Sequence, residues 1–376
     1  MSNPNIEAAV EAFRALVTEQ CERVERMKKS PGATAFTPDR KVRIGLIPGD
    51  GIGPIIVAEA ERVLRGLLRE PLEKGLLELV PIEGLTIENR LALGCPVPPD
   101  TLAAIKSCDV LLKGPTTTPK GGSMESANVA LRRELDLFAN VRPVKIPEQN
   151  IDWIFFRENT EGEYILGSRG VSLPEGLCFD FKVTTDPGTE RIARAAMNYA
   201  VANGKSKVAV VTKANIMKKT DGRFSELCHA VAEREYPTLT LEDWYVDIMS
   251  ANLVNEKLRP GFEVFLMPNL YGDILTDEAA QIQGGVGTAG SANIGDRYAM
   301  FEAIHGSAPR MIEAGLGDYA DPTSILRAAE MLLRHIGRAP EADRLSAALA
   351  ACPVKVTGDR DGATCRRFAD ALLQIL

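Results

Sequence analysis

The sequence predicts an α/β fold. Short apolar segments with the character of buried strands alternate along the chain with segments of helical periodicity. The chain has 376 residues, which suggests two lobes of ordinary domain size. Its composition, 45% hydrophobic and 25% charged, is that of a globular protein.

The first helical segment precedes the alternating pattern. Residues 5–29 carry apolar side chains at helical spacing, Pro31-Gly32 interrupt the helix, and Pro38-Asp39-Arg40 are typical of a linker. We therefore expect residues 1–39 to form a helical extension that packs on a surface or on a partner subunit.

Strands and helices alternate from Val42 onward. The expected strands are residues 42–47, 76–81, 110–113, 151–157, 208–212 and 264–268. The expected helices between them are residues 55–68, 100–107, 187–203, 220–234 and 273–283. Pro54 suits the opening of the first of these helices, because its fixed φ is already helical.

Charge and cysteine content argue against several classes of protein. Lys and Arg total 44 against 51 Asp and Glu, a formal net charge of −7, so the chain lacks the positive field that attracts nucleic acid or an anionic membrane. The apolar runs are far shorter than the roughly 20 residues that span a bilayer, and the acidic N-terminal segment does not resemble a signal peptide. Seven scattered cysteines without Cys-x-x-Cys argue against a disulfide framework or a zinc site. We expect a cytoplasmic protein that binds neither nucleic acid nor membrane and holds any metal through oxygen.

A glycine-rich turn, Pro48-Gly49-Asp50-Gly51-Ile52-Gly53-Pro54, follows the first expected strand. Such a turn can present backbone N–H groups to an anion. However, Pro54 occupies the place of the third glycine of a dinucleotide fingerprint, and no Gly-Lys-Ser/Thr follows. This excludes both a Rossmann motif and a P-loop, and leaves a tight turn that needs positive φ as the alternative.

Hydrogen-bond donors concentrate after the strand at 110–113. They comprise the loop Lys113-Gly114-Pro115-Thr116-Thr117-Thr118-Pro119-Lys120-Gly121-Gly122, then Ser126, Asn128 and Arg132, with Arg142 and Arg157 further along. Clustered guanidinium groups suit bidentate binding of carboxylates. The alternative is a solvated basic face whose arginines pair with Glu134 and Asp136.

Two aspartates indicate a metal site. Asp273 and Asp277 are four residues apart at an expected helix start, so both carboxylates share one face. Two like charges this close favour a bound cation, and oxygen ligands select Mg²⁺ or Mn²⁺. Asp247 is the candidate third ligand, and the alternative is a favourable interaction with the helix N-terminus.

Three further residues are candidates for chemistry. Tyr164 and Lys213 could donate or relay protons when a neighbouring charge or metal tunes them, although either residue alone is more simply a surface side chain. His305 lies in the turn His305-Gly306-Ser307-Ala308-Pro309, and a lone histidine there would ordinarily be structural.

Taken together in this order, these segments resemble the β-decarboxylating dehydrogenase family, which includes isocitrate, isopropylmalate, homoisocitrate and tartrate dehydrogenases. The resemblance runs from about Ile44 to the C-terminus. It implies the two-domain isocitrate/isopropylmalate dehydrogenase-like fold rather than a Rossmann fold. Residues 40–145 and 255–376 would form a large cofactor-binding domain, and residues 146–254 a small domain with the dimerisation region.

The loop from Lys113 to Arg132 is similar to that of the isocitrate-type members, which implies the reaction and its residues. The reaction would be metal-dependent oxidative decarboxylation of isocitrate to 2-oxoglutarate. Ser126 and Asn128 would hold the third carboxylate. The implied roles of the remaining residues are substrate binding for Thr117, Arg132, Arg142 and Arg157, catalysis for Tyr164 and Lys213, and Mg²⁺ or Mn²⁺ ligation for Asp247, Asp273 and Asp277. Members are homodimers with shared sites, so Lys213 and Asp247 are expected to serve the neighbouring subunit.

The implied cofactor contacts leave the choice between NAD and NADP open. They are Lys113, Thr117, His305, Gly306, Ser307, Ala308, Arg310 and Asp321. The pair Arg310-Met311 matches neither the Asp-Ile of NAD-dependent members nor the Lys-Tyr common in NADP-dependent ones. Arg310 could bind a 2′-phosphate, whereas residues 356–362 look more like the NAD type. We expect NAD, with NADP as the alternative.

Two other functions are compatible with the resemblance. The substrate could be a related 2-hydroxy acid, such as homoisocitrate, 3-isopropylmalate, tartrate or a phosphonate analogue. The chain could also be a catalytically silent regulatory subunit, which the presence of all five catalytic and metal positions disfavours.

Overall fold

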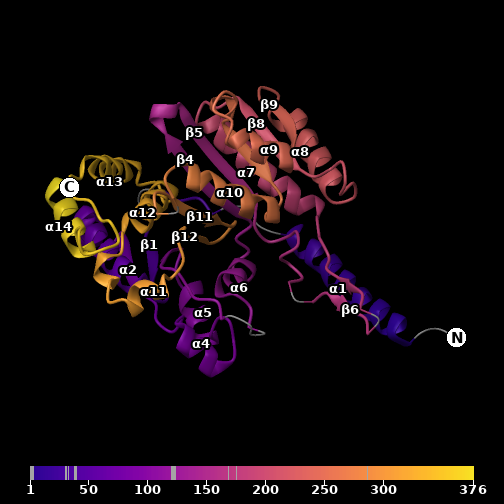
Figure 1. Ribbon diagram of the computed structural model, residues 1–376, viewed down its shortest axis with the longest axis horizontal. Helices are drawn as coiled ribbons and strands as arrows, with labels where there is room; N and C mark the ends of the chain where they lie inside the picture. The colour runs from indigo at the N-terminus through magenta and orange to yellow at the C-terminus, as the bar shows by residue number, and fades with distance from the viewer. Residues whose placement is uncertain are drawn as a thin grey trace. The chain divides into compact units, whose positions relative to one another are not determined.

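The computed structural model describes residues 4–29, 32, 34–37, 40–119, 124–167, 169–174, 176–285 and 287–376. The predictions at Pro31, Pro38-Asp39 and Lys120-Gly121-Gly122 lie outside the described residues. Contacts divide the chain into two compact units (Figure 1). Unit 1 is Met1–Gly32 with Phe138–Ala279, and unit 2 is Ala33–Leu137 with Ala280–Leu376.

Unit 2 contains a mostly parallel sheet. Its strands are β1 (Val42–Ile47), β2 (Leu77–Pro81), β3 (Val110–Lys113), β11 (Gly290–Ile294) and β12 (Ala299–Ala303), in the order β2-β1-β3-β12-β11. Strand β12 pairs in parallel with β3 and antiparallel with β11. The helices are α2 (Gly53–Leu67), α3 (Arg69–Glu73), α4 (Ile87–Leu93), α5 (Pro99–Lys106), α6 (Ala127–Glu134), α11 (Pro309–Glu313), α12 (Thr323–His335), α13 (Ala339–Ala351) and α14 (Cys365–Ile375), with the 3-10 turn η3 (Gly317–Tyr319).

Apolar faces hold the elements of unit 2 together. Helix α12 has a strongly amphipathic sequence and buries residues such as Ile325, Leu326 and Leu332 completely. It packs against β11 and β12, while α14 packs on α2. This core fixes the loops that follow β1, β3 and β12, where the predicted cofactor residues and some of the predicted substrate residues lie.

Unit 1 also contains a set of paired strands. Its strands are β4 (Ala139–Ile146), β5 (Ile151–Glu158), β8 (Lys207–Thr212), β9 (Thr240–Tyr245) and β10 (Val264–Met267), in the order β4-β5-β10-β8-β9. The pair β4–β5 is antiparallel around the 3-10 turn η1 (Pro147–Gln149), and the other pairs are parallel. The helices are α7 (Asp186–Ala202), α8 (Asp221–Glu235), α9 (Val246–Leu253) and α10 (Asn269–Ile282), with the 3-10 turn η2 (Arg259–Gly261).

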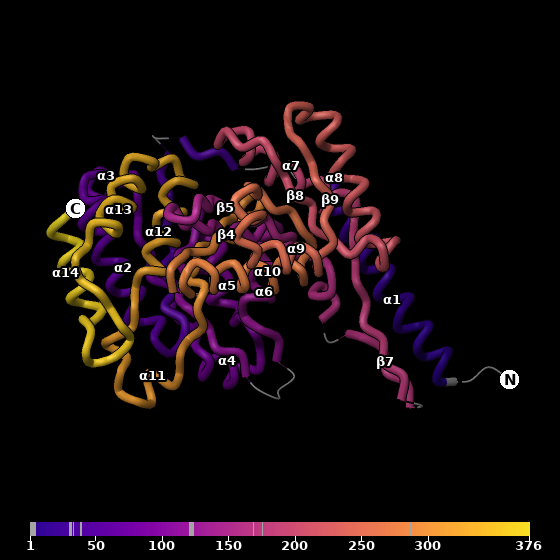
Figure 2. Tube along the Cα trace, turned by 45° about the horizontal axis from the view of Figure 1, so that its top comes forward, coloured from indigo at the N-terminus to yellow at the C-terminus, as the bar shows by residue number. Residues whose placement is uncertain are grey.

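The predicted N-terminal helix is present as α1 (Pro4–Met27) and belongs to unit 1. It lies beside the hairpin formed by β6 (Val171–Ser172) and β7 (Cys178–Phe179), as Figures 1 and 2 show. The Phe13 and Phe181 rings are 5.0 Å apart, and Arg169 pairs with Glu19 at 2.6 Å. No helix among the described residues has an apolar stretch long enough to cross a bilayer.

All six predicted strands are present, and the structure adds others. Strands β4, β9, β11 and β12 escaped prediction because their sequences mix apolar with small or charged residues. The contacts place the division between the units at 137/138 and 279/280, whereas the sequence suggested 145 and 254. The reason is that β4 pairs with β5 along its whole length and β10 lies between β5 and β8. The functional roles assigned to the two domains stay predictions.

Candidate functional site

The glycine-rich turn of unit 2 is a tight structural turn. Gly49 and Gly51 have φ of +74° and +59°, and a Cβ at either position would overlap a carbonyl oxygen of Pro115 or Ser307. The backbone N–H groups of Asp50 and Ile52 donate to these same two carbonyls, at 2.7 and 3.0 Å. Both N–H groups of the turn therefore make hydrogen bonds within the protein. This agrees with a tight structural turn rather than a Rossmann motif or a P-loop.

The carboxylate of Asp50 organises the neighbouring loops. It accepts hydrogen bonds from the backbone N–H groups of Ile87 and Thr117, both at 2.7 Å, and from Arg90 at 3.0 Å. Arg90 is fully buried and also donates to the Thr117 carbonyl at 2.6 Å. Sequence reasoning missed Arg90, because its helix is short and otherwise largely exposed.

Several predicted ligand-binding residues of unit 2 meet at these loops. The hydroxyls of Thr117 and Ser307 are 2.7 Å apart, so the loop after β3 contacts the loop after β12. Thr116 donates to the Asn128 side chain at 3.0 Å, and Ser126 immediately precedes α6. The structure thus brings the predicted cofactor residues Thr117 and Ser307 close to the predicted substrate residue Asn128.

Glu302 is a buried anion on β12, opposite Lys113 at the end of β3, and sequence reasoning missed it. It pairs with Lys113 at 3.1 Å and Arg132 at 3.5 Å, and it accepts from Asn293 at 2.8 Å. Burial acts to raise the pKa of Glu302, but the two cations prevail and lower it to about 2. A lone acid in the otherwise apolar β12 was the available signal.

Arg132 has one unpaired donor in the described structure. Its Nε is buried and has no hydrogen-bond partner within the part of the chain that the structure describes. Arg133 pairs instead with Glu125, at 2.5 Å. Since an unpaired buried donor is costly, the Arg132 guanidinium fits a carboxylate ligand, which supports the prediction for this residue over a solvated basic face.

The loop that follows β12 contains the remaining predicted cofactor residues. Ala308 has φ of +46°, an unusual conformation for a residue other than glycine. His305 Nε2 is buried without a partner among the described residues. Arg310 is exposed in the first turn of α11, next to Pro309, and Asp321 accepts from the Thr323 N–H at 2.8 Å at the start of α12. Gly306, another of the predicted cofactor residues, is also exposed.

Unit 1 brings five predicted site residues together. Arg142 donates to Asp277 at 2.7 Å, and Arg157 forms an ion pair with Asp273. Tyr164 donates to the other Asp273 oxygen at 2.7 Å, and the Arg157 guanidinium lies 5.3 Å from the centroid of its ring. Two guanidinium groups, a phenol and two carboxylates therefore form one polar cluster.

Helix α10 begins earlier than the sequence suggested. It starts at Asn269, so Asp273 and Asp277 lie beyond the first turn. The alternative explanation, an interaction with the helix N-terminus, is correspondingly weaker because that effect fades after one turn. Gly272 is required here, since a Cβ would overlap the Arg157 side chain. Both aspartates present exposed carboxylate oxygens, the ligand type that Mg²⁺ and Mn²⁺ prefer.

Lys213 and Asp247 form a separate pair in unit 1. Lys213 follows β8, and its Nζ lies 2.5 Å from Asp247 Oδ1 near the start of α9. The hydrogen bond from Lys213 lowers the pKa of Asp247. Across the described residues, no three His, Cys, Asp or Glu side chains converge as a metal site. Asp247 is therefore not grouped with Asp273 and Asp277 within one chain.

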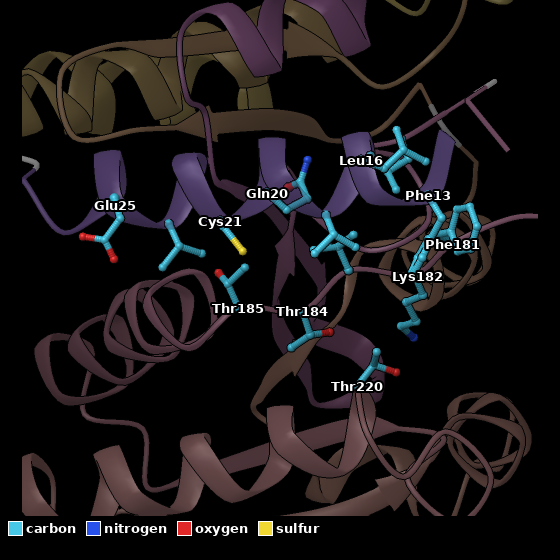
Figure 3. Close-up of a pocket in the computed structure, with 14 residues that line it drawn as sticks. Phe13, Leu16, Gln20, Cys21, Glu25, Phe181, Lys182, Thr184, Thr185 and Thr220 are labelled. Atoms are coloured by element: carbon cyan, nitrogen blue, oxygen red, sulfur yellow. The ribbon is translucent and has the colours of Figure 1, made fainter. Parts of the chain in front are cut away.

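A cavity of about 540 Å³ lies beside α1 (Figure 3). Its walls are mainly apolar side chains such as Phe13, Leu16 and Phe181, together with polar groups including Thr185. No residue predicted for the site lines this cavity.

The fold and the two clusters define an α/β protein equipped to bind carboxylates and carry out acid–base chemistry. The family model described as isocitrate/isopropylmalate dehydrogenase matches residues 43–368. The chain belongs to this family.

Named relatives and a solved structure agree with this assignment. The mitochondrial isocitrate dehydrogenase (NAD) subunit 2 of Schizosaccharomyces pombe is 37% identical over 312 residues, covering 81% of this chain and 79% of that protein. The isocitrate dehydrogenase (NADP) of Rickettsia bellii is 39% identical over 312 residues, covering 81% of this chain and 60% of that protein. The isocitrate dehydrogenase structure from Methylococcus capsulatus has a TM-score of 0.78 and 35% identity, covering 89% of this chain and 99% of that one.

Proposed function

We propose that this protein catalyses oxidative decarboxylation of isocitrate to 2-oxoglutarate and CO₂, with NAD or NADP as hydride acceptor and Mg²⁺ or Mn²⁺ as metal ion. The observation that carries the proposal is the cluster of Arg142, Arg157, Tyr164, Asp273 and Asp277 in unit 1. It would supply carboxylate binding, metal ligation and proton donation, three of the tasks that this reaction requires.

The substrate-binding groups are arginines whose charge is already balanced. The Arg142 side chain is 10% exposed and the Arg157 side chain 1% exposed, so both guanidinium groups are held in place before a ligand arrives. Preorganised donors of this kind bind a carboxylate with little loss of side-chain entropy. Ser126 and Asn128 would add contacts to the third carboxylate, and the Arg132 guanidinium would add another donor.

The metal ion would be held by Asp273, Asp277 and the Asp247 of a neighbouring subunit, and when bound it stabilises negative charge on substrate oxygens. Lys213, oriented by its 2.5 Å contact with Asp247, would help remove the proton of the 2-hydroxyl. Tyr164 would supply a proton to the carbon from which CO₂ has left. Its hydroxyl is already oriented by the hydrogen bond to Asp273.

A substrate comparison tests the proposal. We expect kcat/KM for isocitrate with Mn²⁺ to exceed that for homoisocitrate, 3-isopropylmalate and tartrate by at least about tenfold, which corresponds to about 1.4 kcal/mol. Another acid as the best substrate would contradict the roles of Ser126 and Asn128. A folded protein inactive on all of them, with either cofactor, would instead favour a regulatory subunit.

Substitution of the catalytic lysine tests the mechanism. Lys213→Met should abolish turnover and leave cofactor binding, measured by fluorescence titration, unchanged. An unaltered kcat would refute the role of Lys213.

NAD is the cofactor that we propose, with NADP as the alternative. The Asp321 carboxylate is engaged at the start of α12, and the exposed Arg310 could still reach a 2′-phosphate. The ratio of kcat/KM for the two cofactors in the wild-type enzyme decides between them, and a preference for NADP would overturn the choice.

We also propose a homodimer with shared sites. Support comes from the surface around Lys213 and Asp247, where Ile216 is 66% exposed and Ile248 48% exposed, as expected of a face that a second subunit covers. Mixing the inactive variants Lys213→Met and Tyr164→Phe should regenerate activity in mixed dimers. No recovery after subunit exchange would show that each chain has a self-contained site.

The cytoplasm is the proposed location. All seven cysteines are free thiols, as in a reducing compartment. Cell fractionation tests this, and recovery with an organelle would contradict it.

A further inference from the structure

A buried lysine outside the predicted site connects three of its parts. Lys182 lies between β7 and α7, and its side chain is only 6% exposed. In Figure 3 the side chain extends away from α1, on the side where Thr220 lies. We propose that Lys182 is a positioning residue for the reaction, an inference that rests on the proposed function.

The Lys182 ammonium has three partners from separate segments of unit 1. Its Nζ lies 2.5 Å from Asp221 Oδ1 and 3.3 Å from Glu163 Oε1. It also donates to the Tyr271 hydroxyl at 3.3 Å and lies 4.3 Å from the centroid of that ring. One cation thus joins the start of α8, the segment after β5 and the first turn of α10.

Each partner is adjacent to a residue with a proposed catalytic or metal-binding role. Glu163 immediately precedes Tyr164, and Tyr271 lies two residues before Asp273 on α10. Asp221 uses its second oxygen, Oδ2, to accept the backbone N–H of Lys213 at 2.8 Å. A displacement of Lys182 would therefore be transmitted to the tyrosine, the metal-binding helix and the catalytic lysine together.

The charges explain why the lysine is needed. Asp221 is fully buried, and Glu163 Oε2 is buried without a partner among the described residues. A buried carboxylate without a cation is costly, so removal of the ammonium should displace Asp221, and Glu163, which is 30% exposed, should turn to water or to other partners. Because a misplacement of about 1 Å can cost roughly 100-fold in rate, movement of these acids should lower kcat even though Lys182 touches no reacting atom.

The main variant is Lys182→Met, which keeps the length of the side chain and removes its charge. We expect kcat with isocitrate to fall at least tenfold while KM changes less than threefold. Hydrogen exchange of the Lys213 amide should become faster, since its acceptor Asp221 is no longer held.

Two further variants separate positioning from stability. Lys182→Met combined with Asp221→Asn removes both charges, so it should fold well and still show the lowered kcat. Lys205→Met is the matched control, because Lys205 is also largely buried, at 11% exposure, and pairs with Asp152 at 2.9 Å at the opposite end of the strands. It should lower thermal stability with kcat within twofold of wild type.

The proposal is overturned by a kcat within twofold of wild type in folded Lys182→Met, by recovery of kcat in the double variant, or by an equal loss in Lys205→Met. Failure of the proposed function is a different result, namely a wild-type enzyme without isocitrate turnover. In that case the hydrogen-exchange rate of the Lys213 amide tests the positioning role of Lys182. An unchanged rate in Lys182→Met refutes that role.

Discussion

Replacement of Glu302 by Gln should destabilise the protein strongly, although the two side chains have the same shape. Glu302 is buried beside Lys113 and Arg132, and its pKa of about 2 lies well below the ordinary 4.5. At about 1.4 kcal/mol per pKa unit, this difference corresponds to about 3 kcal/mol of folding free energy at neutral pH. The variant also leaves the fully buried Lys113 ammonium without its anionic partner.

The pH dependence of this loss gives a second check. A depressed pKa stabilises the folded state above the unfolded-state pKa and loses that effect as the pH falls through the folded-state pKa. The contribution of Glu302 is therefore complete above about pH 5 and declines towards pH 2. The difference in the free energy of unfolding between wild type and Glu302→Gln should therefore be about 1 kcal/mol smaller at pH 3.5 than at pH 7.

Urea unfolding at both pH values measures these differences. Asp343→Asn is the control, because Asp343 pairs with Arg334 in unit 2 at 2.8 Å but is 68% exposed, and its loss should cost less than about 1 kcal/mol. A loss below about 1 kcal/mol in Glu302→Gln at pH 7, or a gap that does not change with pH, would refute the reasoning.

Three further substitutions address the substrate, the cofactor and acid stability. Arg142→Lys should raise KM for isocitrate about tenfold or more in steady-state kinetics, because a lysine cannot reproduce the guanidinium fork; an unchanged KM would remove Arg142 from the substrate site. Arg310→Asp should shift the kcat/KM ratio towards NAD if Arg310 meets a 2′-phosphate, and an unaltered ratio would show that it points elsewhere. Burial lowers the pKa of His335 to about 4, so the folded state resists protonation and loses up to about 3 kcal/mol as the pH falls from about 6.5 to 4. In His335→Phe this part of the pH dependence, measured by urea unfolding, should disappear, and its persistence would assign it to other groups.

Local patterns in the sequence were enough to predict the central strands and their bounds. Strands β3 and β10 are continuous apolar runs bounded by turn residues, and their predicted bounds agree with the structure within one residue. Strand β11, Gly290–Ile294, consists mainly of small residues and has no such signal. It forms a strand because it pairs with β12, and its own sequence does not specify that conformation.

The residues of the candidate site also fall into two groups, those that a local pattern predicts and those that it does not. Those in contiguous motifs, such as Asp273 and Asp277, could be found because one helix turn places them together. Glu302, Arg90 and Lys182 could not, since their partners are distant in sequence. Lys113 and Glu302, for example, are 189 residues apart. Burial of a charge depends on tertiary contacts, which no local pattern records.

The pairing of α1 with residues far along the chain affects how the protein is made. Arg23 pairs with Glu161 at 2.9 Å, 138 residues later in the sequence. At about 5–20 residues per second, a ribosome needs about 7–30 s to make that intervening stretch. During this interval Leu16, an apolar side chain of α1 that the folded protein buries, has no native surface to pack on. The ion pair that holds α1 to Glu161 can therefore form only late in the synthesis of unit 1.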